Sequence, residues 1–216
     1  MFARSCSRAR HLLPSCKHGR GFGDLALEDP ARFREDSPYR PGSPYAASKA
    51  SSDLLVRAWA RTYGLPVTIS NCCNNYGSLQ NEEKFIPATI GSIGYGRRPR
   101  LYGDGKNVRD WIHVNDHARA VWTILNEGKL GETYLIGANC ERSNLEVLQT
   151  ILEAMDKRRD FIDWVSDRLG HDRRYAIDAS KLRRELGWVP IQDDFESGLR
   201  EVIVARTAMN KRDLAD

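Results

Sequence analysis

Residues 43–55 read Ser-Pro-Tyr-Ala-Ala-Ser-Lys-Ala-Ser-Ser-Asp-Leu-Leu, and this stretch decides the fold. Ser43 offers a hydroxyl that can accept hydrogen bonds from the free N–H groups at a helix start, and Pro44 suits the first helical position. The sequence therefore predicts a helix from Pro44 to Tyr63, ended by Gly64 as a left-handed cap. The apolar side of this predicted helix carries Leu54, Leu55, Ala58 and Trp59.

Tyr45 and Lys49 are four residues apart in this predicted helix, so their side chains share one face, one turn apart. An ammonium held beside a phenol stabilises the phenolate, which suits proton transfer near neutral pH. Tyr-x-x-x-Lys alone also fits an ordinary surface pair, because many helices carry it by chance. The longer pattern Ser-Pro-Tyr-x-x-Ser-Lys is more specific, and it resembles the catalytic helix of the extended short-chain dehydrogenase/reductase superfamily.

The composition of the 216 residues is ordinary for a globular protein, with 41% hydrophobic and 29% charged residues. The net charge of +4 arises from residues 1–23, which are basic and contain no acidic residue. The remainder is nearly neutral, so the sequence favours neither a nucleic-acid partner nor a membrane surface, and no apolar run is long enough to span a bilayer. The cysteines are odd in number and lack Cys-x-x-Cys spacing, so we expect no disulfide framework, no metal site and a reducing, cytoplasmic compartment.

Strand and helix patterns alternate after residue 64. Val67–Ser70 is typical of a short buried parallel strand, and residues 84–95 predict a helix with Ile86, Ile90 and Ile93 inward. Further helices are predicted to begin at Asn115 or Asp116, with Trp122 among the apolar positions, and at Asn144. A helix followed by a buried strand is half of a βαβ repeat, so the expected fold class is α/β.

Several polar residues follow the predicted strands or begin helices. Asn74 and Asn75 stand where open α/β sheets bind ligands, although Asn also favours ordinary turns. Arg109 and the donor-rich loop at 167–175 could hold a pyrophosphate, but the loop taken alone fits a solvated charge run better. Asn144, at a predicted helix start, could place free N–H groups against a phosphate.

Five longer motifs, taken in order, resemble the dTDP-D-glucose 4,6-dehydratase family. They are Ser-Pro-Tyr-Ala-Ala-Ser-Lys-Ala, Asn-Asn-Tyr-Gly, Lys-Phe-Ile-Pro, Leu-Tyr-Gly-Asp-Gly-Lys-Asn-Val-Arg-Asp-Trp-Ile-His-Val and Gly-His-Asp-Arg-Arg-Tyr-Ala-Ile-Asp. The resemblance covers about Asp24 to Arg206. It implies the C-terminal part of a Rossmann-type doubly wound parallel sheet plus a small α/β sugar-nucleotide domain. Related nucleotide-sugar epimerases lack the Arg-Asp-Trp strand with the His-Asp-Arg-Arg-Tyr loop, which makes an epimerase or a reductase the weaker alternative.

The resemblance also implies a reaction and a site. In that family NAD stores a hydride taken from C4 of dTDP-glucose, water is eliminated across C5 and C6, and the hydride returns to C6. Tyr45 would be the base, Lys49 would assist it and hold the nicotinamide ribose, and Asn75 would touch NAD. A homodimer through the Tyr-Lys helix is implied as well. The implied sugar-nucleotide site comprises Asn74, Lys84, Phe85, Arg100, Leu101, Tyr102, Arg109, Asn144, Asp167, Arg168, Leu169, Gly170 and His171.

Two features of the family are missing from this sequence. No Gly-x-x-Gly-x-x-Gly loop for the dinucleotide pyrophosphate precedes the helix, and residues 18–23 replace the Thr-Asp-Glu whose carboxylates serve the elimination. We therefore expect an N-terminally truncated dehydratase with little or no turnover. The alternative is a catalytically dead fragment that binds sugar nucleotide or pairs with a full-length subunit. An incomplete Rossmann sheet also predicts poor solubility.

Residues 1–23 read as a non-native-looking or disordered tail ahead of a unit at 24–216. Their Arg and Ser richness fits an organellar transit peptide, a disordered tail or out-of-frame translation, and we favour the last. One codon choice for His18–Asp24, read one base later with one T restored, gives Thr-Asp-Glu-Val-Phe. Resequencing codons 15–25 tests this hypothesis, and an intact T run without a frame change excludes it.

Overall fold

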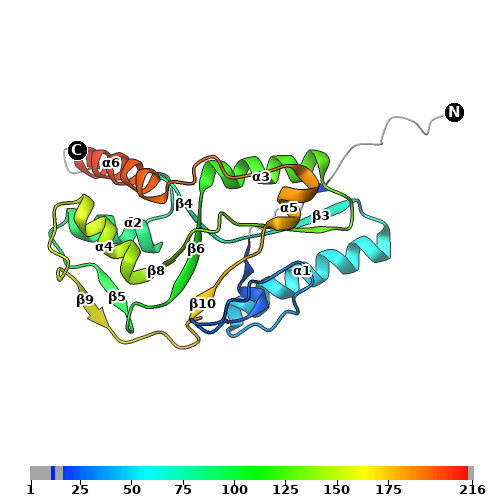
Figure 1. Ribbon diagram of the computed structural model, residues 1–216, viewed down its shortest axis with the longest axis horizontal. Helices are drawn as coiled ribbons and strands as arrows, with labels where there is room; N and C mark the ends of the chain where they lie inside the picture. The colour runs from blue at the N-terminus through cyan, green and yellow to red at the C-terminus, as the bar shows by residue number, and fades with distance from the viewer. Residues whose placement is uncertain (1–10, 13–16, 214–216) are drawn as a thin grey trace.

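The computed structural model describes residues 11–12 and 17–213, in which helices and strands alternate along the chain (Figure 1). The strands are β1 (His11–Leu12), β2 (Lys17–His18), β3 (Val67–Cys72), β4 (Asn74–Tyr76), β5 (Arg100–Tyr102), β6 (Val108–His113), β7 (Thr133–Ile136), β8 (Glu141–Ser143), β9 (Asp163–Val165) and β10 (Arg174–Tyr175). The helices are the 3-10 turn η1 (Gly19–Phe22), α1 (Pro44–Tyr63), α2 (Phe85–Gly94), α3 (Val114–Glu127), α4 (Asn144–Ala154), α5 (Ser180–Leu186) and α6 (Phe195–Asp213). The predicted α/β fold class is confirmed.

β3 is the centre of a parallel sheet. Its neighbour β7 places Thr133 opposite Ile69 and Ile136 opposite Cys72, and the short strands β1 and β2 pair with the two ends of β3. Every residue of β3 is buried, as is usual for a parallel strand covered on both faces. The predicted buried strand is therefore confirmed, and it extends two residues further.

A second sheet forms around β6. β4 and β10 pair with β6 in parallel and β8 pairs with it antiparallel, while β5 and β9 form a separate parallel pair. Since β4 follows β3 after one residue, Asn74 and Asn75 stand where the chain passes between the two sheets. In Figure 1, β6 runs between α2, α4, α6, β5 and β9 at one end and α1, α3, α5 and β3 at the other.

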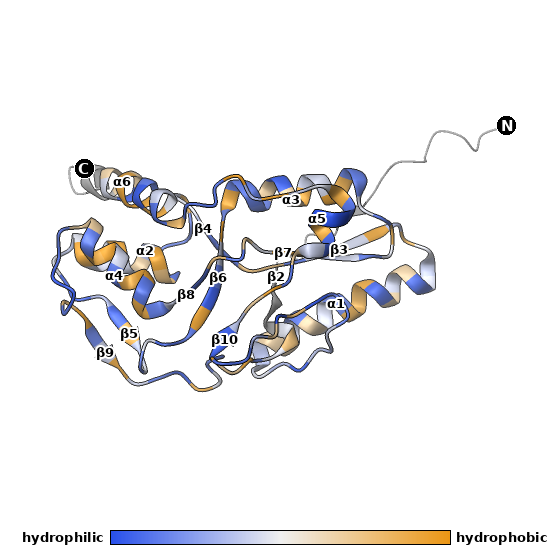
Figure 2. Cartoon of the chain, viewed as in Figure 1, coloured by the Kyte–Doolittle hydropathy of each residue, from blue (hydrophilic) through white to orange (hydrophobic). Residues whose placement is uncertain are grey.

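Each end of the molecule has its own apolar core. We call the unit of α2, α4, α6, β5 and β9 the helical lobe; its core includes Ile86, Ile90, Leu148 and Leu199. We call the unit of α1, α3, α5, β3 and β7 the sheet lobe; its core includes Ile124 and other residues from β6, β7 and α5. Figure 2 shows apolar segments on α2 and α4, and the inward positions predicted for α2 are confirmed.

α1 begins and ends as predicted. The Ser43 Oγ accepts a hydrogen bond from the Ala46 N–H at 3.2 Å, and Gly64 ends the helix with φ 64°. Its buried residues are Ala46, Ala50 and Asp53 alone. The apolar side identified in the sequence faces outward instead, because the sheet contacts the opposite face; Leu54, Leu55 and Trp59 are all exposed.

Two helix starts differ from the prediction. His113, not Asn115 or Asp116, caps α3, because the extended residue at the end of β6 places its Nδ1 3.3 Å from the Asn115 N–H. Ser143, not Asn144, caps α4, and its Oγ accepts from the Glu146 N–H while the Glu146 carboxylate accepts from the Ser143 N–H. The buried positions of α3 are also shifted relative to the predicted apolar stripe, which leaves Trp122 exposed.

The described part of the chain contains no helix long and apolar enough to cross a membrane. It also contains no group of three or more His, Cys, Asp or Glu side chains that could hold a metal ion.

Candidate functional site

A cavity of about 960 Å³ lies beside the end of β4 and receives residues from both lobes, from α1 on one side and from α2, β5 and β9 on the other. This volume is at the upper end of the range of small-molecule sites. The following predicted site residues line it: Tyr45, Asn74, Asn75, Lys84, Phe85, Arg100, Tyr102 and Arg168. The structure thus gathers residues that are far apart in the sequence around one space.

Tyr45 and Lys49 lie on one face of the first two turns of α1, as predicted. The Lys49 Nζ is 5.2 Å from the centroid of the Tyr45 ring, within the range of a cation–π contact. Tyr45 lines the cavity and is 50% exposed, so a ligand can reach its hydroxyl. Lys49 does not line the cavity; it lies beside the Tyr45 ring.

Four buried polar atoms on the cavity wall have no hydrogen-bond partner within the described residues. They are Oδ1 of Asn74, Oδ1 of Asn75, Oε1 of Gln80 and Nε1 of Trp111. Gln80 is held in place by its Nε2, which donates to the carbonyl of Asn75 at 2.8 Å. Buried polar groups in folded proteins are nearly always paired, so three acceptors and one donor on one wall indicate a polar ligand.

The cavity wall carries five cationic side chains and two carboxylates. The carboxylates are each beside one cation, with Glu83 Oε1 at 2.7 Å from Lys84 Nζ and Asp163 Oδ2 at 3.8 Å from Arg100 Nε. Among the described residues, Arg97, Arg98 and Arg168 have no carboxylate partner; instead their guanidinium groups lie over the rings of Tyr95, Phe161 and Tyr102, respectively. Guanidinium groups available in a cleft suit a phosphate-bearing ligand.

Two features hold the loop at 167–171, a hydrogen bond within the loop and a close approach to the backbone before α1. Arg168 of this loop lies at the cavity wall. His171 Nδ1 lies 2.6 Å from Asp167 Oδ1, and this hydrogen bond lowers the pKa of the Asp167 carboxyl. Gly170 adopts φ 65°, and a Cβ there would lie 3.2 Å from the carbonyl oxygen of Gly42, just before α1. The loop therefore connects the cavity wall of the helical lobe with the start of the Tyr45 helix.

The other predicted binding residues do not line the cavity: Leu101, Arg109, Asn144, Asp167, Leu169, Gly170 and His171. Arg109 is 3% exposed, and its guanidinium donates to the carbonyls of Val108 at 2.7 Å and Asp172 at 2.8 Å. Leu101 packs in the core of the helical lobe, whereas Leu169 is fully exposed. The ligand contacts that the resemblance implies for these residues stay predictions.

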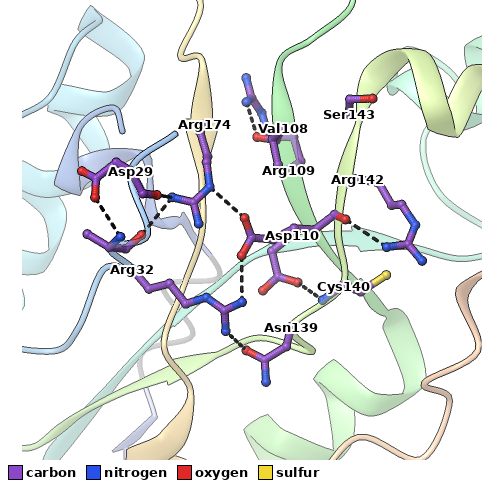
Figure 3. Close-up of polar contacts among 12 residues, drawn as sticks. Asp29, Arg32, Val108, Arg109, Asp110, Asn139, Cys140, Arg142, Ser143 and Arg174 are labelled. Carbon is purple, nitrogen blue, oxygen red and sulfur yellow. Dashed lines mark hydrogen bonds and ion pairs between the residues drawn. The ribbon is translucent and has the colours of Figure 1, made fainter. Parts of the chain in front are cut away.

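The proline-rich loop that leads into α1 is anchored by a polar network (Figure 3). Arg174 donates to the carbonyls of Asp29 and Ala31, and its Nε lies 2.8 Å from Glu141 Oε2. The Arg32 guanidinium binds Glu141 and Asn139 from the other side. The network attaches residues 29–32 to β8 and β10, and so fixes where α1 begins relative to the second sheet.

Asp110 lies at the base of the same region, next to Cys140 in Figure 3. Its Oδ1 accepts a hydrogen bond from the Cys140 N–H at 2.7 Å, and its side chain is buried at 1% exposure. The pKa of Asp110 is raised to about 6, chiefly by burial; the Cys140 N–H and Arg32 oppose this shift, and the Glu141 carboxylate adds to it. Asp110 supports the sheet beneath the cavity and does not line it.

Sequence reasoning missed part of the cavity wall. Gln80, Thr89, Arg97, Arg98 and Asp163 line it without having been predicted. The paired arginines just after α2 gave no specific signal, because cations after the C-terminal end of a helix are common as complements of the helix dipole. The contributions of Gln80 and Asp163 depend on the tertiary fold, since both lie in irregular or short extended segments.

Comparison with known proteins gives consistent matches. The family model described as GDP-mannose 4,6 dehydratase matches residues 21–202. A dTDP-glucose 4,6-dehydratase of Mycolicibacterium smegmatis is 60% identical over 182 residues, which are 84% of this chain and 55% of that protein. The same enzyme of Escherichia coli is 50% identical over 196 residues, with 84% of this chain and 54% of that protein covered. The chain spans about half the length of the curated relatives it matches.

Solved structures agree with these matches. The dTDP-glucose 4,6-dehydratase of Bacillus anthracis in complex with NAD superposes with a TM-score of 0.85 at 41% identity, covering 91% of this chain and 61% of that one. DesIV of Streptomyces venezuelae, a dTDP-glucose 4,6-dehydratase with NAD and TYD bound, gives 0.85 at 41%, covering 94% and 60%. A UDP-glucuronic acid 4-epimerase of Bacillus cereus, at 20% identity and a TM-score of 0.83 over 90% of this chain and 60% of that one, shows the shared fold alone. The expected Rossmann-type architecture is confirmed.

Proposed function

The chain belongs to the GDP-mannose 4,6 dehydratase family, and from that premise we propose that it is the dTDP-glucose-binding part of a dTDP-glucose 4,6-dehydratase. The observation that carries the proposal is the wall of the 960 Å³ cavity, where four unpartnered buried polar atoms stand beside cations that no described carboxylate neutralises. A nucleoside diphosphate sugar satisfies both features, because its diphosphate is anionic and its sugar carries hydroxyl groups. No wholly apolar ligand does.

In this proposal the two walls of the cavity have different tasks. Arg168, Arg100 and Lys84 bind the diphosphate, since guanidinium and ammonium groups form charge-assisted hydrogen bonds with phosphate oxygens. Asn74 contacts the sugar, using an Oδ1 that has no partner among the described residues. Tyr45 faces the same space from α1, where it can take the proton of a sugar hydroxyl.

NAD is the cofactor that we propose. The described residues fit its nicotinamide end: Tyr45 and Lys49 lie one turn apart, and Asn75 offers an unpartnered Oδ1 at the end of the strand. When bound, NAD supplies hydride storage. The part of the chain that the structure describes presents no Gly-x-x-Gly-x-x-Gly turn between a strand and a helix, so we assign no residue to the dinucleotide pyrophosphate.

The chemistry that this chain's residues supply is proton transfer at the sugar C4 hydroxyl. Tyr45 accepts the proton, and the Lys49 ammonium stands beside the ring on the same face of α1. The segment before the proline-rich loop, residues 17–22, runs beside β3 and contributes no carboxylate for an elimination step. We therefore propose that turnover by this chain is lower by roughly two to four orders of magnitude than with such an acid and base in place.

A binding role beside a second subunit is the other candidate, and the surface of α1 favours it. Leu54, Leu55, Trp59 and Tyr63 are 54 to 65% exposed on one helix. Exposed apolar side chains gathered on a single helix are typical of an interface. We propose that a second copy of the chain, or a longer homologous subunit, covers this face. We also propose a reducing, cytoplasmic compartment, in which the cysteines stay reduced.

The decisive test is a calorimetric titration of the purified chain with dTDP-glucose, combined with a turnover assay that follows the alkaline absorbance of the 4-keto-6-deoxy product with and without NAD. We expect saturable binding that Arg168→Met weakens by about tenfold, because a hydrogen bond between charged groups is lost. Arg61→Met, which changes an exposed arginine of α1, is the matched control and should bind as the parent does. Absence of binding, or equal weakening by both variants, would contradict the proposed site.

The turnover arm separates the two candidates. We expect little product from this chain with added NAD. Rapid product formation would show that other residues replace the missing carboxylates and would contradict the proposed loss of activity, while leaving the binding site in place.

A further inference from the structure

A second, smaller cavity of about 210 Å³ lies beside α2 and α6. It is lined by Ala88, Gly91 and Ser92 of α2, by Tyr95 and Arg97 just after that helix, and by Glu82 and Arg206. Its volume is below the roughly 300 Å³ at which sites for larger organic ligands begin. Only a small ligand fits.

Arg206 is the unusual residue of this cavity. It is 6% exposed, and within the described residues its Nε is buried without a hydrogen-bond partner. Its one ion pair among the described residues joins Nη1 to Glu82 Oε1 at 3.6 Å, and the Glu82 side chain is 84% exposed. A buried guanidinium is stable when its donors bind an anion, and the long contact with Glu82 leaves the buried Nε without an acceptor.

Arg97 supplies a second guanidinium at the same cavity. It is exposed, and its Cζ lies 5.8 Å from the centroid of the Tyr95 ring, so both side chains stand at the cavity wall. The Ser92 hydroxyl adds a neutral donor. Two cations, one hydroxyl and one largely solvated carboxylate leave a positive wall.

Another small cavity, of about 290 Å³ in the sheet lobe, shows the opposite arrangement. There Lys181 Nζ lies 2.7 Å from Glu132 Oε2 and also donates to the Thr133 carbonyl, while the Glu35 carboxylate accepts from the Leu135 N–H. Acids and bases are matched in that cavity. The unmet demand for an anion at the Arg206 cavity is therefore not a property of every charged hollow in this chain.

We propose that the cavity between α2 and α6 binds a small oxyanion of the phosphate class, with Arg206 as the buried donor and Arg97 and Ser92 as further donors. The site differs from the large cavity, although Arg97, Ala88 and Ser92 line both. The inference does not depend on the nucleotide proposed for the large cavity.

Inorganic phosphate is the probe, titrated into the purified chain by calorimetry at constant ionic strength with chloride as the compensating salt. We expect saturable binding that Arg206→Met weakens at least about tenfold, since charge-assisted hydrogen bonds are lost, and that Arg206→Lys restores in part. Arg200→Met alters an exposed arginine on the same helix and is the matched control, expected to bind within twofold of the parent.

A variant in the large cavity tells the two anion sites apart. Arg168→Met should remove only phosphate bound in the large cavity and leave the Arg206-dependent binding within twofold; a loss in Arg168→Met with no change in Arg206→Met would place all of the phosphate in the large cavity and overturn the proposal. A response no greater than that to chloride would overturn it as well. Should Arg206→Met fail to fold, Arg97→Met, on the surface, is expected to weaken binding about threefold, and unchanged binding there and in Arg206→Lys would count against the site.

Discussion

The two walls of the large cavity differ in how much apolar core lies behind them. The wall from α2, β5 and β9 belongs to the helical lobe, whose core holds Leu148 and Ile151 at 0% exposure. The wall from α1 carries Tyr45 and Lys49 on a helix of 20 residues of which only three are buried. The proposed ligand binding and the proposed proton transfer therefore depend on parts of the molecule with unequal numbers of buried contacts.

The contacts that do hold α1 are mostly polar. The Tyr39 hydroxyl donates to the buried Asp53 carboxylate at 2.9 Å, and burial, together with the Asp53 charge, raises the pKa of Tyr39 to about 12. Arg57 Nη2 donates to Thr133 Oγ1 at 2.6 Å, which attaches the helix to β7. Since a net hydrogen bond contributes only about 1 kcal/mol, α1 should open at a lower free energy than the helical lobe.

The largest expected effect on the free energy of unfolding comes from the difference in apolar packing between the helical lobe and α1. Leu148→Ala, in the core of the helical lobe, should lower the free energy of unfolding by about 2–5 kcal/mol, because it leaves a cavity among packed side chains. Leu55→Ala removes the same atoms from α1, where the side chain is 60% exposed, and should change it by no more than about 0.5 kcal/mol. Urea unfolding of the two variants measures the difference, and equal losses would contradict the comparison.

The second prediction concerns Asp110, on β6 between the two lobes. Its pKa of about 6 lies above the ordinary 3.8, so the folded chain binds a proton that the unfolded chain has released between about pH 4 and 6. Stability from this group is greatest below pH 4 and falls as pH rises through that window. By linkage the loss reaches on the order of 1–3 kcal/mol at pH 7.

Asp110→Asn keeps an acceptor for the Cys140 N–H but cannot ionise. It should therefore be more stable than the parent at pH 7 by about 1–3 kcal/mol, and nearly equal to it at pH 4. Urea unfolding at several pH values between 4 and 7 tests this. Parallel pH curves for parent and variant would show that the Asp110 carboxylate is stabilised by Arg32 and Cys73 more than burial opposes it.

The third prediction compares the two walls of the large cavity by how much a substitution in each changes the affinity for dTDP. Tyr102→Leu removes the ring that lies 3.9 Å from the Arg168 guanidinium carbon, so dTDP should bind roughly three- to tenfold more weakly, in line with the loss of a cation–π contact. Tyr45→Phe alters only the α1 wall and should leave dTDP affinity within about twofold, since the diphosphate is bound by the helical lobe. Calorimetric titration of both variants tests the division, and it fails if Tyr45→Phe has the larger effect.

The sequence predicted the elements that local rules determine. Ser43, Pro44 and Gly64 define α1 through capping and backbone preference alone, and the four-residue spacing placed Lys49 beside Tyr45. Tertiary partners decided the rest. The sequence pattern suggested that Arg109 could bind a pyrophosphate. In the structure its guanidinium donates to the carbonyl of Asp172, which is 63 residues away.

Faces of helices were harder to predict than their ends. Periodicity identified an apolar side on α1 and on α3, but it cannot say whether a sheet or another surface covers that side. The structure buries the opposite face of α1 and leaves Trp122 of α3 exposed at 66%. On α1 the misjudged face exposes Leu54, Leu55 and Trp59, whereas on α3 the large apolar side chain left exposed by the shift is Trp122.

The smallest expected effect comes from the N-terminal caps of α4 and α1. Ser143 and Glu146 form a reciprocal capping box on α4, so Ser143→Ala should lower the free energy of global unfolding by about 1 kcal/mol. Ser43→Ala removes a single 3.2 Å hydrogen bond from α1. Because α1 opens before the core does, this loss should appear as faster amide hydrogen exchange in α1 with little change in global stability. Ser51→Ala, on the exposed face of α1, is the control and should slow exchange slightly or leave it unchanged. A global loss from Ser43→Ala equal to that from Ser143→Ala would mean that α1 and the helical lobe unfold as one unit.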